Sequence, residues 1–205
     1  APSAAPEATS TPAVTATPEP TATPEPTPTA TPEPMFTNPL TGEQTYTDYS
    51  QTRPVAIMVE NNHWDDGTLI AQGGLSQADI VYEMQVESIT RNMFVFMDTD
   101  GLNNVFPIRS ARSYFVSAAL SYDAIFAHCG KSGEGLEFAD TMLVNYTDAD
   151  DIEVHEGSCG FRQYDAPYFG AVHSMTTTGE RLQDLFAQYG TRTTHRTDGY
   201  DYGLH

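Results

Sequence analysis

Basic residues are scarce in this sequence. Nine Lys and Arg stand against 28 Asp and Glu, and the formal net charge is −19. A surface this acidic repels phosphate backbones and anionic lipid headgroups. We therefore expect the chain to bind no nucleic acid, and to meet a membrane only through a lipid anchor that lies outside this sequence.

Long apolar runs are absent as well. The sequence has no stretch of 18 apolar residues, so we expect no membrane-spanning helix. It opens on small residues and a Pro/Thr-rich tract instead of a methionine. This start is typical of a protein cut after a signal sequence, and we predict an extracytoplasmic lipoprotein anchored to the cell membrane.

Cysteine is limited to Cys129 and Cys159. In an extracytoplasmic protein the two thiols can form a disulfide worth about 3 kcal/mol, and the alternative is a pair of buried free thiols. His128 and His155 lie close to them in sequence, but the CxxC and HxxxH spacings of zinc sites are missing. We therefore expect no metal site and no cofactor.

Most prolines lie at the start of the chain. Residues 1–34 contain ten of the 14 prolines, no Lys or Arg, and three copies of the phrase ATPEP. Such a segment has almost no apolar surface to bury, and its prolines favour an extended polyproline II conformation. We expect a disordered linker over residues 1–36 that holds the folded domain away from a surface.

From residue 37 to residue 190, β-rich runs alternate with helical patterns. This order predicts an α/β layered sandwich of a mixed sheet with helices. The expected strands span residues 53–61, 79–87, 92–98, 105–108, 123–130 and 152–155. The expected helices span residues 111–121, 133–143 and 178–189. Ser110, Ser132 and Thr177 are the predicted N-caps, and Gly190 is predicted to end the last helix.

Polar residues occupy two predicted strand-to-helix turns, at residues 108–112 and 128–132. In open α/β sheets, ligands bind in the crevice at the carboxyl ends of the strands. Arg109 and Arg112 offer guanidinium forks that match carboxylates and phosphates, and Ser110 adds a hydroxyl at the helix start. The full set of candidate ligand-binding residues is Arg109, Ser110, Arg112, His128, Gly130, Ser132, Glu83 and His173.

The same residues have a structural interpretation. The acidic partners available to the two arginines are Asp79, Glu83, Glu87 and Asp123. Ion pairs with such carboxylates would hold the strands and the helix in register, and His128 would then be a hydrogen-bonded core residue. A network of this kind implies a scaffolding domain that needs no ligand.

A hydrolase is the third interpretation, because a serine beside a histidine can act as a nucleophile. No GxSxG elbow is present to support it. Paired carboxylates are a second route, but Glu83 and Glu87 on one strand face would be about 13 Å apart, too far for glycoside hydrolysis. The serine and histidine candidates are Ser110 or Ser132 with His128 or His173.

Five phrases of the sequence, taken in order, resemble the YerB-like family of bacterial lipoproteins: NPLTG, RPVAIMVEN, GLSQADIVYE, PIRSARSYF and YDAIFAHCGKSGEGLE. The resemblance covers residues 38–178. It implies a secreted, lipid-anchored protein with an α/β sandwich domain, usually followed by a second domain, and it implies no catalytic residue. Asn92 and Cys129 depart from the family pattern, and residues 161–177 match it loosely, which weakens any role carried onto Arg162 or His173.

These observations predict three parts: a linker at residues 1–36, a YerB-like α/β domain at residues 37–190, and the start of a truncated or absent C-terminal domain at residues 191–205. The predicted function is that of a surface-tethered, extracytoplasmic domain. It binds a small polar or anionic ligand or a partner in the cell envelope. The alternatives are a hydrolase that acts on an envelope substrate and a purely structural scaffolding domain.

Overall fold

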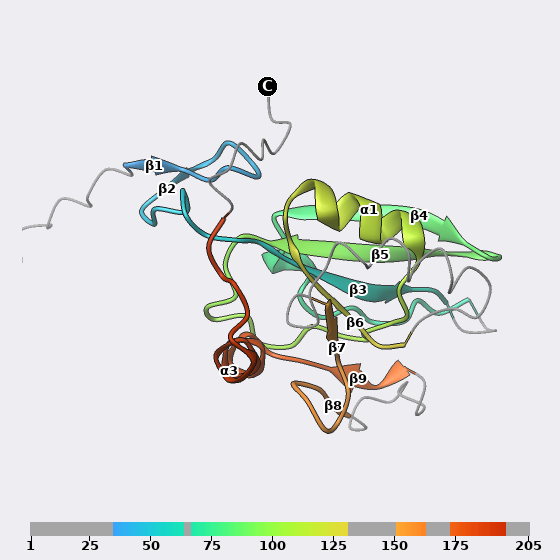
Figure 1. Ribbon diagram of the computed structural model, residues 1–205. Helices are drawn as coiled ribbons and strands as arrows, with labels where there is room; N and C mark the ends of the chain where they lie inside the picture. The colour runs from blue at the N-terminus through green and yellow to red at the C-terminus, as the bar shows by residue number, and fades with distance from the viewer. Residues whose placement is uncertain (1–34, 64–66, 131–150, 163–172, 196–205) are drawn as a thin grey trace, which may run out of the picture. The chain divides into compact units, whose positions relative to one another are not determined.

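The computed structural model describes residues 35–63, 67–130, 151–162 and 173–195. Its centre is a five-stranded sheet with the strand order β4-β5-β3-β6-β7 (Figure 1). The strands are β3 (Val55–Asn61), β4 (Ile80–Val86), β5 (Ile89–Phe96), β6 (Ile125–His128) and β7 (Asp151–Glu153). β3, β6 and β7 run parallel, whereas β5 is antiparallel to β3 and β4. The predicted α/β fold with a mixed sheet is thus confirmed.

Alternation along the central strand β3 gives the sheet two apolar faces. On one face, its even-numbered apolar side chains pack with α1 (Ser113–Ser121), which buries Phe115 there. On the other face, its odd-numbered side chains pack with α3 (Gly179–Tyr189), which buries Leu182 and Phe186. Figure 1 shows the two helices on opposite sides of the sheet.

Short elements complete the described part of the chain. They are β1 (Phe36–Thr37) paired with β2 (Gln44–Thr45), the 3-10 helix η1 (Leu75–Gln77), and β8 (Phe161–Arg162) paired with β9 (Met175–Thr176). Between β1 and β2, the side chain of Asn38 accepts the Leu40 N–H at 2.8 Å, which forms a turn within the phrase NPLTG. No helix in this part of the chain is both long and apolar enough to cross a membrane.

β4 alternates as predicted. Tyr82 and Met84 are half-buried on the α1 side, whereas Val81 and Glu83 are exposed. Glu87 lies beyond the end of β4, in the two-residue turn to β5, with a φ of 38°. The expectation that Glu83 and Glu87 share one strand face is therefore wrong, because the strand ends before Glu87.

Residues 107–111, the phrase PIRSA, lie between the carboxyl ends of β3 and β6, and we call them the inserted segment. Their backbone bonds to both strands: Glu60 N donates to Pro107 O (2.9 Å), Arg109 N to Met58 O (3.1 Å), Cys129 N to Arg109 O (3.0 Å) and Ala111 N to Gly130 O (2.9 Å). The strand expected at residues 105–108 is reduced to isolated bridges, since its hydrogen bonds go to several different partners.

The helix that follows the inserted segment begins later than the sequence suggested. Arg112 is the N-cap of α1, and the predicted cap Ser110 lies two residues too early. The backbone oxygen of Ser110 instead accepts hydrogen bonds from Arg91 (3.1 Å) and Arg112 (3.3 Å). The predicted helix at residues 133–143, with its cap Ser132, lies outside the described residues.

The cap of α3 is also shifted, by one residue. Thr178 accepts the Arg181 N–H at 3.3 Å. The predicted cap Thr177 is buried and donates its hydroxyl to the Cys159 carbonyl at 2.9 Å. Gly190 ends the helix in the left-handed region, with a φ of 66°, as predicted.

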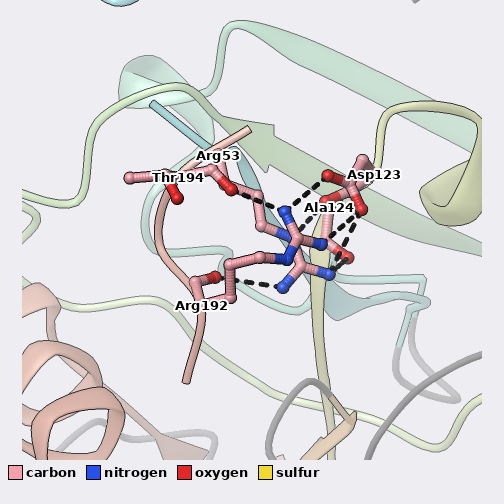
Figure 2. A network of polar contacts seen from close by, with 5 residues as sticks. All are labelled: Arg53, Asp123, Ala124, Arg192 and Thr194. Carbon is pink, nitrogen blue, oxygen red and sulfur yellow. Dashed lines mark hydrogen bonds and ion pairs between the residues drawn. The ribbon is translucent and has the colours of Figure 1, made fainter. Parts of the chain in front are cut away.

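A buried aspartate joins residues 191–195 to the sheet (Figure 2). Asp123 is 5% exposed, and each of its carboxylate oxygens accepts a hydrogen bond of 2.7 Å from Arg192. Arg53 donates to the backbone oxygens of Asp123 and, at 3.1 Å, of Arg192. We call these three residues the Asp123 network. Because Arg53 precedes β3 and Asp123 precedes β6, the network fixes the starts of two parallel strands.

Candidate functional site

A buried carboxylate lies at the carboxyl end of the central strand. Glu60, in β3, is 0% exposed, and its Oε2 lies 2.7 Å from Nε of Arg109 and 3.1 Å from Nδ1 of His173. The arginine contact is an ion pair whose angle falls outside hydrogen-bond geometry. Both partners are 20% exposed. We call Glu60, Arg91, Arg109 and His173 the Glu60 cluster.

Four segments of the chain bring this cluster together. β3 supplies Glu60, the inserted segment supplies Arg109, and His173 lies two residues before β9. Arg91 comes from β5 and stands opposite Glu60 in the antiparallel register. The cluster therefore occupies the strand-end position where α/β sheets usually bind ligands.

Positive charge is concentrated around Arg91. The pKa of Arg91 is lowered to about 10, chiefly by burial and also by the neighbouring Arg112 and Arg109 guanidiniums, against the opposing effect of Glu60 and Glu87. Among the described residues around Arg91, three arginines thus face two glutamates, in a chain of net charge −19. A surplus of arginine favours a bound anion.

Arg112 has a carboxylate partner of its own. Its guanidinium binds Glu87 through Nε at 2.9 Å and Nη2 at 3.1 Å, and Nη1 donates to the Ala111 carbonyl at 2.9 Å. Arg112 is 12% exposed and Glu87 61%. This pair fastens the start of α1 to the β4–β5 turn, which is the structural interpretation for Arg112. Asp123, another partner considered from the sequence, is used by Arg53 and Arg192.

Three surface hollows lie apart from the cluster. One of about 340 Å³ is bordered by residues 158–159 and by α3, and one of about 410 Å³ by residues 100–103 and the start of α3. The third, of about 220 Å³, lies beside Arg53 of the Asp123 network. None of the three is lined by a residue of the Glu60 cluster. The charged side chains of the cluster therefore lie outside these hollows.

Residues 40–192 match the family model described as "Protein of unknown function (DUF3048) N-terminal domain". The chain belongs to this family. The matched region contains β3 to α3, the Glu60 cluster and the Asp123 network.

Relatives of known name agree with that assignment. The chain is 33% identical over 161 residues to the Bacillus subtilis (strain 168) protein named "Putative lipoprotein YerB", covering 78% of this chain and 45% of that protein. The crystal structure of the YerB protein from Bacillus subtilis matches with a TM-score of 0.63 and 30% identity, over 79% of this chain and 52% of that one. The chain thus spans about half the length of these relatives, and the resemblance to the YerB-like family is confirmed.

His128 does not belong to the cluster in this YerB-like domain. It is 0% exposed, and its ring nitrogens face the Gly130 carbonyl (2.9 Å) and an Asp151 carboxylate oxygen (2.9 Å). Both partners are acceptors, so both contacts are hydrogen bonds only when the ring carries two protons. The geometry is that of a core histidine with partners on both sides.

The remaining predicted site residues are spread over the YerB-like domain. Ser110 and Gly130 are neighbours: a Cβ at Gly130 would lie 3.3 Å from the Ser110 hydroxyl oxygen. Glu83 pairs with Asn92 in the register and so lies on the opposite face of the sheet from Glu60. Ser132 lies outside the described residues. Of the eight predicted residues, Arg109 and His173 are the two whose side chains meet on one carboxylate, that of Glu60.

Two residues of the cluster were missed by sequence reasoning. Glu60 is the one acidic residue in the apolar phrase RPVAIMVEN. An acidic residue in a buried strand indicates a nearby partner, since buried charges need partners, and this signal could have identified Glu60. The acidic residue nearest to Arg91 in sequence is Glu87, but Glu87 binds Arg112. Arg162 lies near this region and donates to Ser174 at 3.1 Å.

The two cysteines of the domain are free thiols, with Cys159 buried and Cys129 half-buried. The described residues contain no group of three or more metal-ligating side chains. Burial raises the pKa of both thiols. We therefore expect slow reaction with a disulfide reagent such as DTNB at pH 7, faster reaction as pH rises, and Cys129 reacting before Cys159. Denatured, unreduced protein that releases no thiol would instead show a disulfide.

Proposed function

We propose that this domain binds a small anionic ligand at the Glu60 cluster. The single observation that carries the proposal is the surplus of arginine over glutamate around Arg91 in a strongly acidic chain. Arg109 and His173 are each one-fifth exposed, so they form the rim through which a ligand reaches Glu60. Guanidinium groups bind carboxylates and phosphates through paired donors.

The cellular setting is part of the same proposal. A relative that is 33% identical to this chain over 161 residues is named as a lipoprotein, and the Pro/Thr-rich tract of residues 1–34 has the composition of a spacer. These features support an extracytoplasmic domain tethered to the cell membrane. The ligand would then be a component of the envelope or of the surrounding medium.

Titration calorimetry of the whole chain with inorganic phosphate at low ionic strength tests the binding proposal. We expect saturable binding that weakens about tenfold or more in Arg109→Ala, because a hydrogen bond to a charged group contributes about 1.5–3 kcal/mol. Arg181→Ala is the control, since Arg181 lies on α3 and stacks over Phe161. Absence of binding, or equal binding by wild type and Arg109→Ala, would contradict the proposal.

A hydrolase is the second candidate, favoured by the contact between His173 Nδ1 and Glu60 Oε2. In hydrolytic triads a carboxylate on one ring nitrogen orients the histidine so that the other nitrogen acts as a base. Glu60 is placed to orient His173 in this way. His128 has a similar contact with Asp151, but its complete burial keeps it from a substrate.

The hydrolase candidate is tested with p-nitrophenyl acetate and p-nitrophenyl phosphate as substrates. An enzyme would release p-nitrophenol above the buffer rate, and His173→Ala would abolish the excess while His155→Ala, which changes an exposed histidine, would not. A binding domain would show no excess rate in any variant. If phosphate binding fails as well, the results favour the interpretation of the domain as a structural scaffold.

A further inference from the structure

Apart from the Arg109–Glu60 ion pair, two buried polar atoms of the Glu60 cluster have no hydrogen-bond partner among the described residues. One is Oε1 of Glu60 and the other is Nε of Arg91. Glu60 is 0% exposed and Arg91 3%. A buried polar atom left without a partner costs about as much as a lost hydrogen bond. Two of them in one cluster indicate that a further group completes the site.

The two atoms belong to side chains that face each other. Glu60 in β3 and Arg91 in β5 are directly paired in the antiparallel register, which places their Cβ atoms about 5 Å apart on the same face of the sheet. Even so, Glu60 and Arg91 do not form an ion pair with each other. Oε2 of Glu60 points to Arg109 and His173 instead. The guanidinium of Arg91 instead donates through Nη1 to Ser110 O.

The chemistry of the two atoms selects the missing group. A carboxylate oxygen only accepts hydrogen bonds, and a guanidinium nitrogen only donates them. An anion between them would be repelled by Glu60, and an ammonium group would be repelled by Arg91. A hydroxyl group suits both, since it donates to Oε1 and accepts from Nε. A fixed water molecule has the same capacity.

We propose that the ligand of the Glu60 cluster is a hydroxyl-bearing anion, whose hydroxyl lies between Glu60 Oε1 and Arg91 Nε. Its acidic group, a phosphate or a carboxylate, lies toward Arg109 and the rim. This inference rests on the proposed anion binding and adds a hydroxyl group to the description of the ligand. In the unliganded protein a water takes the place of the hydroxyl.

Matched ligand pairs test the inference on the whole chain. Calorimetry compares glycerol 3-phosphate with propyl phosphate, and glycerate with propionate, so that each pair differs by its hydroxyls. We expect the hydroxylated member to bind about tenfold more tightly, because a site with buried polar atoms discriminates against a ligand that leaves them unpaired. The pair with the larger absolute affinity shows whether the acidic group is a phosphate or a carboxylate.

Arg91→Lys is the decisive variant, because lysine keeps the positive charge but places a carbon where arginine has Nε. The preference for the hydroxylated ligand should fall to about twofold or less, while the non-hydroxylated ligand keeps its affinity. Arg181→Lys, on α3, and Glu43→Gln, in the exposed turn before β2, are the controls and should keep the full preference. Glu60→Gln should also lower the preference, and wild-type measurements alone suffice if that variant fails to fold.

The outcomes separate the two proposals. Equal binding within both pairs by wild type would overturn the hydroxyl inference and leave anion binding in place, with a fixed water as the only occupant between Glu60 and Arg91. The same conclusion follows if Arg91→Lys retains the full preference. Failure of every anion to bind, inorganic phosphate included, would overturn the proposed function and this inference together.

Discussion

Replacing Asp123 by alanine is expected to lower the free energy of unfolding by about 3–5 kcal/mol, the range for breaking a buried ion pair from one side. The change leaves the Arg192 and Arg53 guanidiniums without the carboxylate that they share. It also releases residues 191–195 from the start of β6. Urea unfolding followed by circular dichroism measures the effect.

Two further variants separate the causes of that loss. Asp123 has a φ of 52°, a left-handed conformation that asparagine tolerates and alanine does not. Asp123→Asn therefore removes the charge without the backbone strain, and should account for most of the loss. Asp184→Ala changes an exposed aspartate on α3 and should alter stability by less than about 1 kcal/mol. A loss of that small size in Asp123→Ala would show that the network contributes little.

Gly179→Ala is expected to destabilise the domain by about 3 kcal/mol or more, the upper range for overpacking a core. Gly179 is the first residue of α3 and is buried. A Cβ there would overlap the Thr99 carbonyl oxygen and lie 2.9 Å from its carbonyl carbon. Both atoms belong to backbone, which cannot rotate away. Helix propensity predicts the opposite sign, a gain of about 1 kcal/mol for alanine over glycine.

Gly190→Ala is the matched control at the other end of α3. Nothing lies within 4 Å of a Cβ at Gly190, but its φ of 66° is left-handed. Its cost should therefore be about 1–2 kcal/mol, the strain of one residue in that conformation. Thermal or urea unfolding of the two variants side by side gives the comparison. A stabilised Gly179→Ala variant would mean that α3 does not pack closely against residue 99.

The sheet was the most predictable part of the molecule. The phrase RPVAIMVEN became the central strand, and the alternation at residues 79–87 became the edge strand β4. Both patterns are local, because a strand's period of two depends only on which face is buried. The pairing of β4 with β5 is equally local, because only a short connection separates the two runs.

The helix caps show where local reasoning stopped. Thr177 and Glu180 have the spacing of a capping box, yet the Thr177 hydroxyl bonds to Cys159, 18 residues away. Ser110 precedes an apolar helical pattern, yet its carbonyl accepts hydrogen bonds from two arginines. In each case, the residue that the local pattern predicted as a helix cap instead bonds to a residue distant in sequence.

The candidate site was harder still to predict. Arg109 was correctly marked as a residue at a strand end, but its partner Glu60 lies 49 positions earlier and His173 lies 64 positions later. A single sequence carries no information on such pairings. Arg112 and His128 were grouped with Arg109 because of their positions at two turns, but each has a separate carboxylate partner.

The Asp123 network has a mechanical consequence. Residues 51–53 and 192–195 run side by side, through the Thr52–Thr194 bridge and the hydrogen bonds from Arg53 N to Thr193 O (2.9 Å) and from His195 N to Gln51 O (3.0 Å). The chain thus enters and leaves the sheet at the same point. A pulling force on flanking segments would load this short antiparallel contact first, and would separate its hydrogen bonds one after another before it reached β3.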